Sequence, residues 1–145
     1  MTRAGVRALG LDLGSKRVGV AVGDRTGTIA SPLQVLQRSG SMKRDHEAIA
    51  KLVIEEEADI VVVGLPLNMN GSSGPAAQAA IDEAAALATV VAVPVVTFDE
   101  RRTTVTADQA MIEAKMRAQA RRRIVDKIAA AVMLQNWLDA GGPRA

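Results

Sequence analysis

The order of apolar and polar positions divides the chain into strand-like and helix-like segments. Short apolar or alternating runs predict strands, and apolar residues three and four positions apart predict helices. Turn-forming Gly, Asp and Pro residues separate these segments. We expect strands over residues 6–13, 17–22, 28–36, 60–64 and 93–98, and helices over 42–57, 75–88, about 104–116 and 121–139.

The lengths of the connections predict how the strands run. Short turns at 14–16 and 24–27 indicate that the first three strands are antiparallel, because parallel strands need long crossovers. The later strands alternate with helices, which is typical of a parallel arrangement. We therefore expect one α/β domain over residues 1–145, with a five-stranded mixed sheet flanked by helices. This element order is similar to that of the ribonuclease H-like fold.

Composition excludes several kinds of chemistry. The chain has no Cys, which excludes disulfides, zinc ribbons and thiol catalysis. Its one histidine, His46, lies on a predicted surface helix, which excludes Ser-His catalysis and multi-histidine metal sites. Phe98 and Trp137 are the only aromatic residues, so a module that stacks bases on rows of aromatic rings is not expected. No membrane span or signal-peptide core is present, and we expect a cytoplasmic protein with no membrane partner.

Acidic residues interrupt three otherwise apolar settings. Asp12 ends the first strand, Asp99 and Glu100 end the last, and Asp126 lies in the final apolar helix. A carboxylate in such a place loses hydration and needs a compensating partner. Functional groups gather at the carboxyl ends of parallel strands, so these acids from distant parts of the chain are expected to lie close together. A cation that they share is therefore the favoured partner. Oxygen ligands of this kind suit Mg²⁺ or Mn²⁺.

This arrangement suits hydrolysis of a phosphodiester by two bound divalent ions. We assign Asp12 as the bridging ligand, with Glu100 and Asp126 as flanking ligands, and these three as the catalytic residues. Asp99 is the less favoured ligand, because neighbouring strand residues point to opposite faces of a sheet.

Each acid also has basic neighbours that could form a purely structural ion pair. The candidate partners are Lys16 and Arg17 for Asp12, Arg101 and Arg102 for Glu100, and Arg122 and Arg123 for Asp126. Taken together with the element order, the three acids favour the metal site.

Basic and glycine-rich segments surround the predicted metal site. The turn after Asp12 offers backbone N–H groups to a phosphate. Residues 101–123 hold seven basic and two acidic residues; this run is either a solvated helix face or a contact for phosphates. The uncharged loop over 64–74 is predicted to contact substrate. The expected substrate-binding residues are Gly14, Lys16, Arg17, Asn68, Asn70, Gly71, Arg101, Arg102, Arg121, Arg122 and Arg123.

Four sequence blocks, at 10–21, 63–71, 99–104 and 125–130, resemble the YqgF/RuvX family. Members of that family are described as pre-16S rRNA nucleases and as Holliday junction resolvase-like proteins. The resemblance implies a ribonuclease H-like fold, dependence on Mg²⁺ or Mn²⁺, and nuclease activity on structured RNA or branched DNA. It implies in particular processing of the 5′ end of pre-16S rRNA in ribosome biogenesis. Asp12, Glu100 and Asp126 match the acidic positions of the family.

The chain departs from related patterns at two positions. Arg102 stands where family members often have Leu, which adds a charge beside the predicted site. Ala129 follows Asp126 by three residues, where well-studied bacterial junction resolvases of similar fold have a second Asp. The second departure argues against junction resolution and leaves metal-dependent cleavage as the main expectation.

Three alternatives compete with a precursor-rRNA nuclease. One is a Holliday junction resolvase in DNA recombination and repair. Another is a non-catalytic nucleic-acid-binding factor in ribosome assembly. The third is an ATP-binding domain of the actin and sugar-kinase type, suggested by Asp12-Leu13-Gly14, although such proteins bind nucleotide between two domains. Both a monomer and a homodimer are compatible with the sequence.

Overall fold

The computed structural model describes residues 6–65, 74–99 and 118–142, with the backbone alone described over 118–127. Four of the strands and two of the helices precede the last parallel strand, and a long helix follows it. The elements are β1 (Ala8–Leu13), β2 (Arg17–Gly23), β3 (Ala30–Gln37), α1 (Met42–Glu55), β4 (Ile60–Leu65), α2 (Pro75–Ala88), β5 (Val95–Asp99) and α4 (Ala118–Asp139). The helix expected over 104–116 lies outside the described residues.

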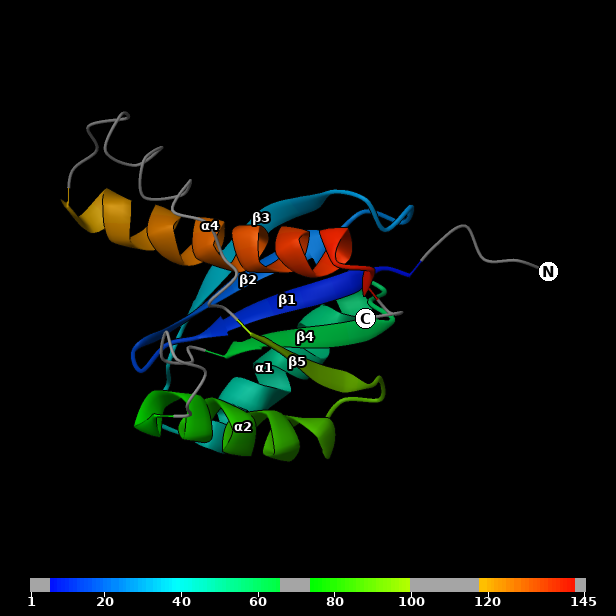
Figure 1. The fold of residues 1–145 in the computed structure, drawn as a ribbon. Helices are drawn as coiled ribbons and strands as arrows, with labels where there is room; N and C mark the ends of the chain where they lie inside the picture. Colours follow the sequence, from blue (N-terminus) through cyan, green and yellow to red (C-terminus); the bar gives the residue numbers. More distant parts are fainter. Residues whose placement is uncertain (1–5, 66–73, 100–117, 143–145) are drawn as a thin grey trace.

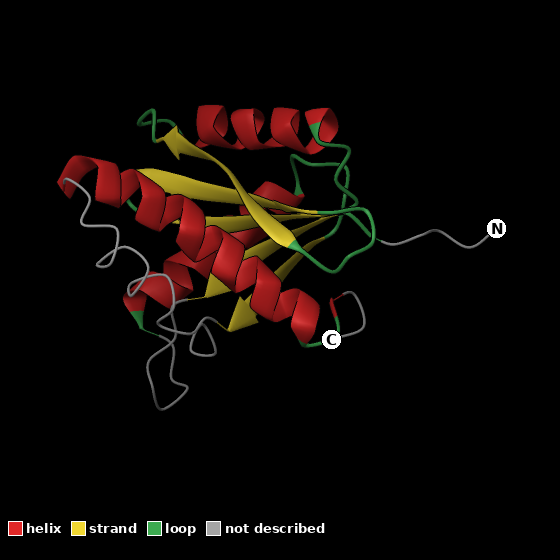
Figure 2. Ribbon diagram, turned by 90° about the horizontal axis from the view of Figure 1, so that it is seen from above, coloured by secondary structure: helices red, strands yellow, loops and turns green. Residues whose placement is uncertain are grey.

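The five strands form one mixed sheet in the order β3-β2-β1-β4-β5. Strand β1 is antiparallel to β2, and β2 is antiparallel to β3. Strand β4 is parallel to both β1 and β5. Helix α4 covers one face of the sheet, and α1 and α2 cover the other (Figures 1 and 2). The predicted ribonuclease H-like architecture is confirmed.

Strand alternation divides the apolar residues into two cores, one on each face of the sheet. Leu9 and Leu11 of β1 belong to the core beneath α1 and α2. Ala8 of the same strand packs with Met133 and Leu134 of α4 in the other core. Because side chains alternate along a strand, the contacts of these residues show toward which face of the sheet each other residue of the strand points.

Helix α4 packs closely against the sheet at Gly10. A Cβ atom at Gly10 would lie 3.0 Å from the Cβ of Leu134, so the small residue permits this contact. Farther along the helix, the Gln135 side chain accepts from the Ala30 N–H at 2.9 Å and donates to the Thr28 carbonyl at 2.8 Å. The helix thus packs on β1 and bonds to the start of β3. No helix among the described residues is long and apolar enough to span a membrane.

Strand β3 begins at Ala30, two residues later than expected, because Asp24 holds the preceding turn. One Asp24 oxygen accepts from the N–H groups of Thr28 at 2.9 Å and Ile29 at 3.1 Å. The other accepts from the Thr26 hydroxyl at 2.6 Å. The Thr26 hydroxyl first, and then these two backbone N–H groups, hold the pKa of Asp24 well below its ordinary value. The local side-chain bonds therefore compete successfully with the strand.

Helix α1 ends at Glu55, two residues before the expected position, because the chain turns sharply at Glu57. Glu57 has a φ of 53°. The Ala58 N–H bonds to the Val53 carbonyl at 2.9 Å, and the Glu57 N–H bonds to the Ile54 carbonyl at 3.1 Å. This pair of bonds is the Schellman ending of a helix, with Glu57 in the position that usually holds glycine.

Two other boundaries differ from the sequence-based expectation. Strand β5 begins at Val95 instead of residue 93, because Pro94 has no N–H for the sheet. Helix α4 begins at Ala118 instead of Arg121 and ends, as predicted, at Asp139. His46 lies in a surface helix, as predicted, but on its buried face: the residue is only 2% exposed, and its Nε2 atom bonds to Glu83 of α2.

Candidate functional site

Asp12 lies near the carboxyl end of β1, on the face that α4 covers. Ala8 and Gly10 precede it at two-residue intervals and both contact the α4 side. Asp12 is half-buried and pairs in register with Gly19 of β2. The strand therefore holds this carboxylate in a partly desolvated position beneath a helix.

Asp99 ends β5 on the opposite face of the sheet. Val96 and Phe98 pack on the α4 side, whereas Val95 packs on the α1 and α2 side. By the same alternation Asp99 faces α1 and α2, where it is half-buried. Asp12 and Asp99 are thus separated by the sheet itself.

Helix α4 brings its N-terminal half toward the carboxyl ends of β1 and β4 (Figure 1). Leu134 is the residue opposite Gly10 of β1. Backbone position 126 is eight residues earlier, about 12 Å along the helix axis. The described backbone therefore carries position 126 toward the end of the sheet at which Asp12 lies.

Several predicted site residues lie where the structure gives no side-chain description. Glu100, Arg101, Arg102, Asn68, Asn70 and Gly71 fall outside the described residues, and Asp126, Arg121, Arg122 and Arg123 fall in the part of α4 described by backbone alone. Within the described side chains, no group of three or more His, Cys, Asp or Glu could hold a metal ion. The ligand set Asp12, Glu100 and Asp126 stays a prediction.

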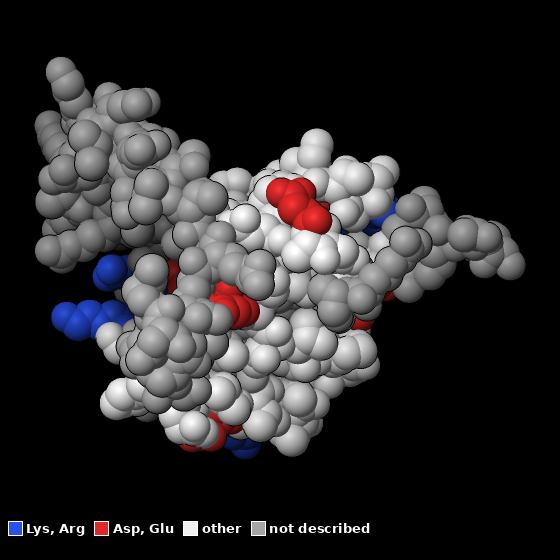
Figure 3. Space-filling model, in the orientation of Figure 1, with Lys and Arg blue, Asp and Glu red and all other residues white. Residues whose placement is uncertain are grey.

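The turn between β1 and β2 is closed by its own backbone. The Gly14 N–H bonds to the carbonyls of Asp12 at 3.1 Å and Arg17 at 2.9 Å. A Cβ at Gly14 would lie 2.6 Å from the Arg17 carbonyl oxygen, so the turn requires glycine. Lys16 is exposed at its tip, and Arg17 is half-buried at the start of β2. In Figure 3, Lys and Arg side chains project from the edge of the molecule at which β1 turns into β2.

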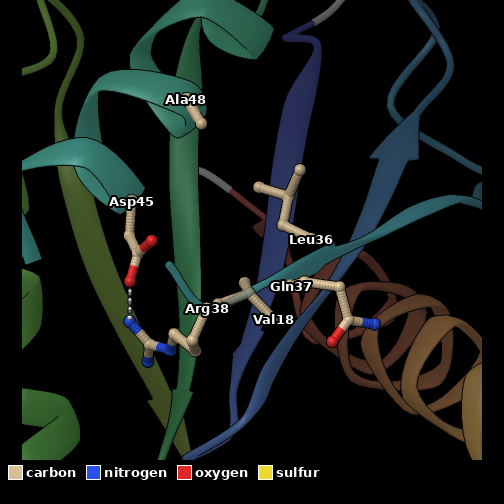
Figure 4. A pocket seen from close by; sticks show the side chains of 6 residues that line it. All are labelled: Val18, Leu36, Gln37, Arg38, Asp45 and Ala48. Carbon is tan, nitrogen blue, oxygen red and sulfur yellow. Dashed lines mark ion pairs between the residues drawn. The ribbon is translucent and has the colours of Figure 1, made fainter. Parts of the chain in front are cut away.

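A buried cluster of charged and polar side chains lies next to this turn: Arg38, Asp45, His46 and Glu83. It was not predicted from the sequence. The Arg38 Nη1 and Nη2 atoms donate to the two Glu83 carboxylate oxygens at 2.7 and 2.9 Å. Glu83 also bonds to the Nε2 atom of His46 at 2.8 Å, and Arg38 lies 3.6 Å from Asp45. Figure 4 shows Arg38 and Asp45 facing each other, with Val18, Leu36, Gln37 and Ala48 beside them. One signal could have indicated the cluster: Glu83 stands among buried positions of an alanine-rich helix.

The charges in this cluster stabilise one another. Burial is the largest influence on Glu83 and opposes its ionisation, but the hydrogen bonds from Arg38 and His46 outweigh it, so the pKa of Glu83 is lowered. The hydrogen bonds to Glu83 raise the pKa of Arg38. At Asp45 burial again opposes ionisation, and bonds from Ser39 and Arg38 lower the pKa overall. All three groups are therefore held in their charged forms.

The Arg38 side chain also reaches the turn beside Asp12. Its Nε atom donates to the Gly14 carbonyl at 3.0 Å. Its backbone N–H donates to the Lys16 carbonyl at 2.9 Å. The turn that follows Asp12 is thus bonded to a cluster formed by Arg38, the residue after β3, with side chains of α1 and α2.

A family model described as "RuvX: Holliday junction resolvase" matches residues 6–140. The chain belongs to the RuvX family. A protein of Mycobacterium sp. (strain KMS) named "Putative pre-16S rRNA nuclease" is 48% identical over 134 residues, which cover 92% of this chain and 79% of that protein. A protein of Thermoanaerobacter pseudethanolicus with the same name is 42% identical over 136 residues, covering 93% and 97%.

A solved structure supports the fold independently of sequence. RuvC of Thermus thermophilus, solved in complex with a Holliday junction substrate, superposes with a TM-score of 0.60 at 16% identity. The superposition covers 97% of this chain and 98% of RuvC. At this identity the likeness shows that the RuvX chain shares the fold, and function has to be argued from its own site.

Proposed function

We propose that this RuvX protein is a metal-dependent nuclease that hydrolyses phosphodiester bonds in structured RNA and processes the 5′ end of pre-16S rRNA. The observation that carries the proposal is the position of Asp12. Its carboxylate lies half-buried at the carboxyl end of a central strand, under the helix that contains Asp126. The names of the mycobacterial and Thermoanaerobacter relatives support the choice of substrate. This substrate would place the protein in the cytoplasm.

We propose Asp12, Glu100 and Asp126 as the catalytic metal ligands. Phe98, two residues before Glu100 in the sequence, packs on the α4 side of the sheet. Asp126 belongs to α4, whose residues Ala130, Met133 and Trp137 are buried against this face of the sheet. The positions of Phe98 and of α4 support one site on the α4 face of the sheet.

The same alternation argues against Asp99 as a ligand, because it would have to reach through the sheet to join Asp12. Carboxylate oxygens suit Mg²⁺ or Mn²⁺, and two such ions, when bound, would activate a water molecule and stabilise the leaving oxygen. The chain itself would bind the substrate: we propose that Lys16 and Arg17 contact phosphates beside the scissile bond. The bonds from the Gly14 N–H to the carbonyls of Asp12 and Arg17 keep Lys16 and Arg17 at the end of the hairpin at which Asp12 lies.

A cleavage assay tests the proposal. A labelled 5′ precursor fragment of 16S rRNA and a four-way DNA junction are incubated with Mg²⁺, Mn²⁺ or EDTA. We expect metal-dependent cleavage of the RNA by the wild type and a loss of at least about a hundredfold in Asp12→Asn. Asp99→Asn and Asp82→Asn, the latter exposed on α2, are the matched controls and should cleave normally.

The other outcomes separate the competing functions. Preferential cleavage of the junction would favour a resolvase. Binding of the precursor without cleavage by the wild type would favour a non-catalytic assembly factor. Equal losses in Asp12→Asn and Asp99→Asn would contradict the assignment of the site to the α4 face.

A further inference from the structure

We propose that Arg38 is a positioning residue that holds the turn carrying Lys16 and Arg17, so that these side chains meet substrate phosphates. The inference rests on the proposed binding of nucleic acid at this turn. It concerns a residue on the face of the sheet opposite Asp12, which touches neither the metal ligands nor the substrate in the proposed mechanism.

Arg38 bonds to the turn from two directions. Its backbone N–H donates to the Lys16 carbonyl at 2.9 Å, which closes the end of the β2–β3 pairing. Its Nε atom donates to the Gly14 carbonyl at 3.0 Å. The two acceptors lie at either side of the turn, so one residue fixes both.

The guanidinium group is itself held by two helices. Its Nη1 and Nη2 atoms donate to the Glu83 carboxylate in α2, and this carboxylate is 8% exposed. His46 of α1 bonds to the same carboxylate, and Asp45 lies 3.6 Å from Nη1. A planar guanidinium group can donate two hydrogen bonds to the Glu83 carboxylate from its Nη atoms and a third, from Nε, to the Gly14 carbonyl. Through Arg38, the turn is therefore bonded to side chains of α1 and α2, and this restrains its position.

The turn needs such a constraint because it is exposed. Gly14, Ser15 and Lys16 are all exposed, and a loose turn would lose conformational entropy when it binds a phosphate. Asp12 lies within the paired part of β1: it pairs with Gly19 of β2, and the preceding Leu11 pairs with Val63 of β4. Loss of Arg38 should therefore weaken binding and leave the chemical step unchanged.

The decisive variant is Arg38→Lys. A lysine keeps the charge opposite Glu83, but its single ammonium group does not reproduce the fixed three-donor geometry. Arg38→Met removes the charge as well. The matched control is Arg25→Met, which breaks the exposed Arg25–Glu57 ion pair away from the turn.

Binding of the labelled precursor RNA is measured in the Asp12→Asn background across a KCl titration, so that cleavage does not interfere. We expect Arg38→Lys to weaken binding about tenfold and to lower the slope of log K against log salt by about 1 to 2, one for each phosphate that the turn no longer neutralises. Amide exchange of Gly14 should become at least about tenfold faster. In the active protein, KM should rise with kcat unchanged, a split that a general loss of stability would not produce. Arg25→Met should change none of these values.

Arg38→Met leaves Glu83 buried without its main partner and can prevent folding. The double variant Arg38→Met/Glu83→Gln removes both charges and keeps the test available. Folded Arg38 variants with wild-type affinity, salt slope and Gly14 exchange would overturn the inference. Failure of the wild type to bind would overturn the proposed function together with it, whereas wild-type binding without cleavage would overturn the nuclease alone.

Discussion

Replacing Glu83 with Gln should destabilise the protein in a way that depends on pH. The variant keeps the size of the side chain and removes its negative charge. Arg38 would then lose its main counterion, although Asp45 remains 3.6 Å away. Glu83 is 8% exposed and the Arg38 side chain 15% exposed, so neither charge is well solvated. Breaking a buried pair of this kind costs about 3 kcal/mol at pH 7.

The pH dependence follows from the lowered pKa of Glu83. Folded protein holds this carboxyl ionised below its unfolded pKa of 4.5, so the unfolded state binds more protons in this range. The stabilisation by Glu83 is complete above pH 4.5 and is lost as the pH falls through the folded pKa. Gln does not titrate. The difference in stability between the two proteins should therefore shrink steadily below pH 4.5. The shift at Asp24 cancels, because Thr26, Thr28 and Ile29 are its partners in both proteins.

Urea unfolding provides the measurement, followed by the fluorescence of Trp137, the only tryptophan, which is 4% exposed. Curves at pH 7 and at several values below 4.5 give the free energy of unfolding for each protein. Glu57→Gln is the control, since its exposed pair with Arg25 contributes less than about 1 kcal/mol. A Glu83→Gln protein as stable as the wild type at pH 7 would refute the reasoning. So would a stability difference that does not change with pH.

Two further substitutions test the packing of α4 and the end of α1. Gly10→Ala should cost about 1–3 kcal/mol in urea unfolding, because its Cβ would lie 3.0 Å from the Leu134 Cβ and displace α4; unchanged stability would show that the helix yields freely. Glu57→Gly should raise the stability by about 0.5–1 kcal/mol, because Glu57 has a φ of 53° that glycine adopts without strain. Glu57→Ala removes the same ion pair with Arg25 but keeps the Cβ, and a comparable gain in that variant would contradict the explanation.

Local patterns in the sequence were sufficient for the sheet. Short turns after β1 and β2 specify antiparallel neighbours, and helical crossovers specify parallel ones, so the strand directions follow from connection lengths. Boundaries were less exact where side chains bond to nearby backbone. Asp24 captures the N–H groups that would have begun β3, and the turn at Glu57 ends α1 early. Such competition depends on geometry that an apolar pattern does not encode.

The candidate site, too, was predicted in part from the sequence and in part only from the structure. From the sequence, strand alternation could separate only Asp99 from its neighbour Glu100. The structure added that Asp12 lies on the α4 face and Asp99 on the other. The assignment of Glu100 and Asp126 as its partners stays a prediction. The charged cluster next to the turn was not foreseen, nor was the burial of His46 within it.

What the sequence determined by itself is the order, type and direction of the elements, because these follow from periodicity and from short connections. Only the tertiary structure decided which distant polar groups meet. Arg38 and Glu83 are 45 residues apart, and His46 and Glu83 are 37 apart. Each of these residues taken alone is compatible with a solvated surface. Their pairing becomes favourable only when α1 and α2 pack on the same face of the sheet and remove the water that would otherwise solvate the charges.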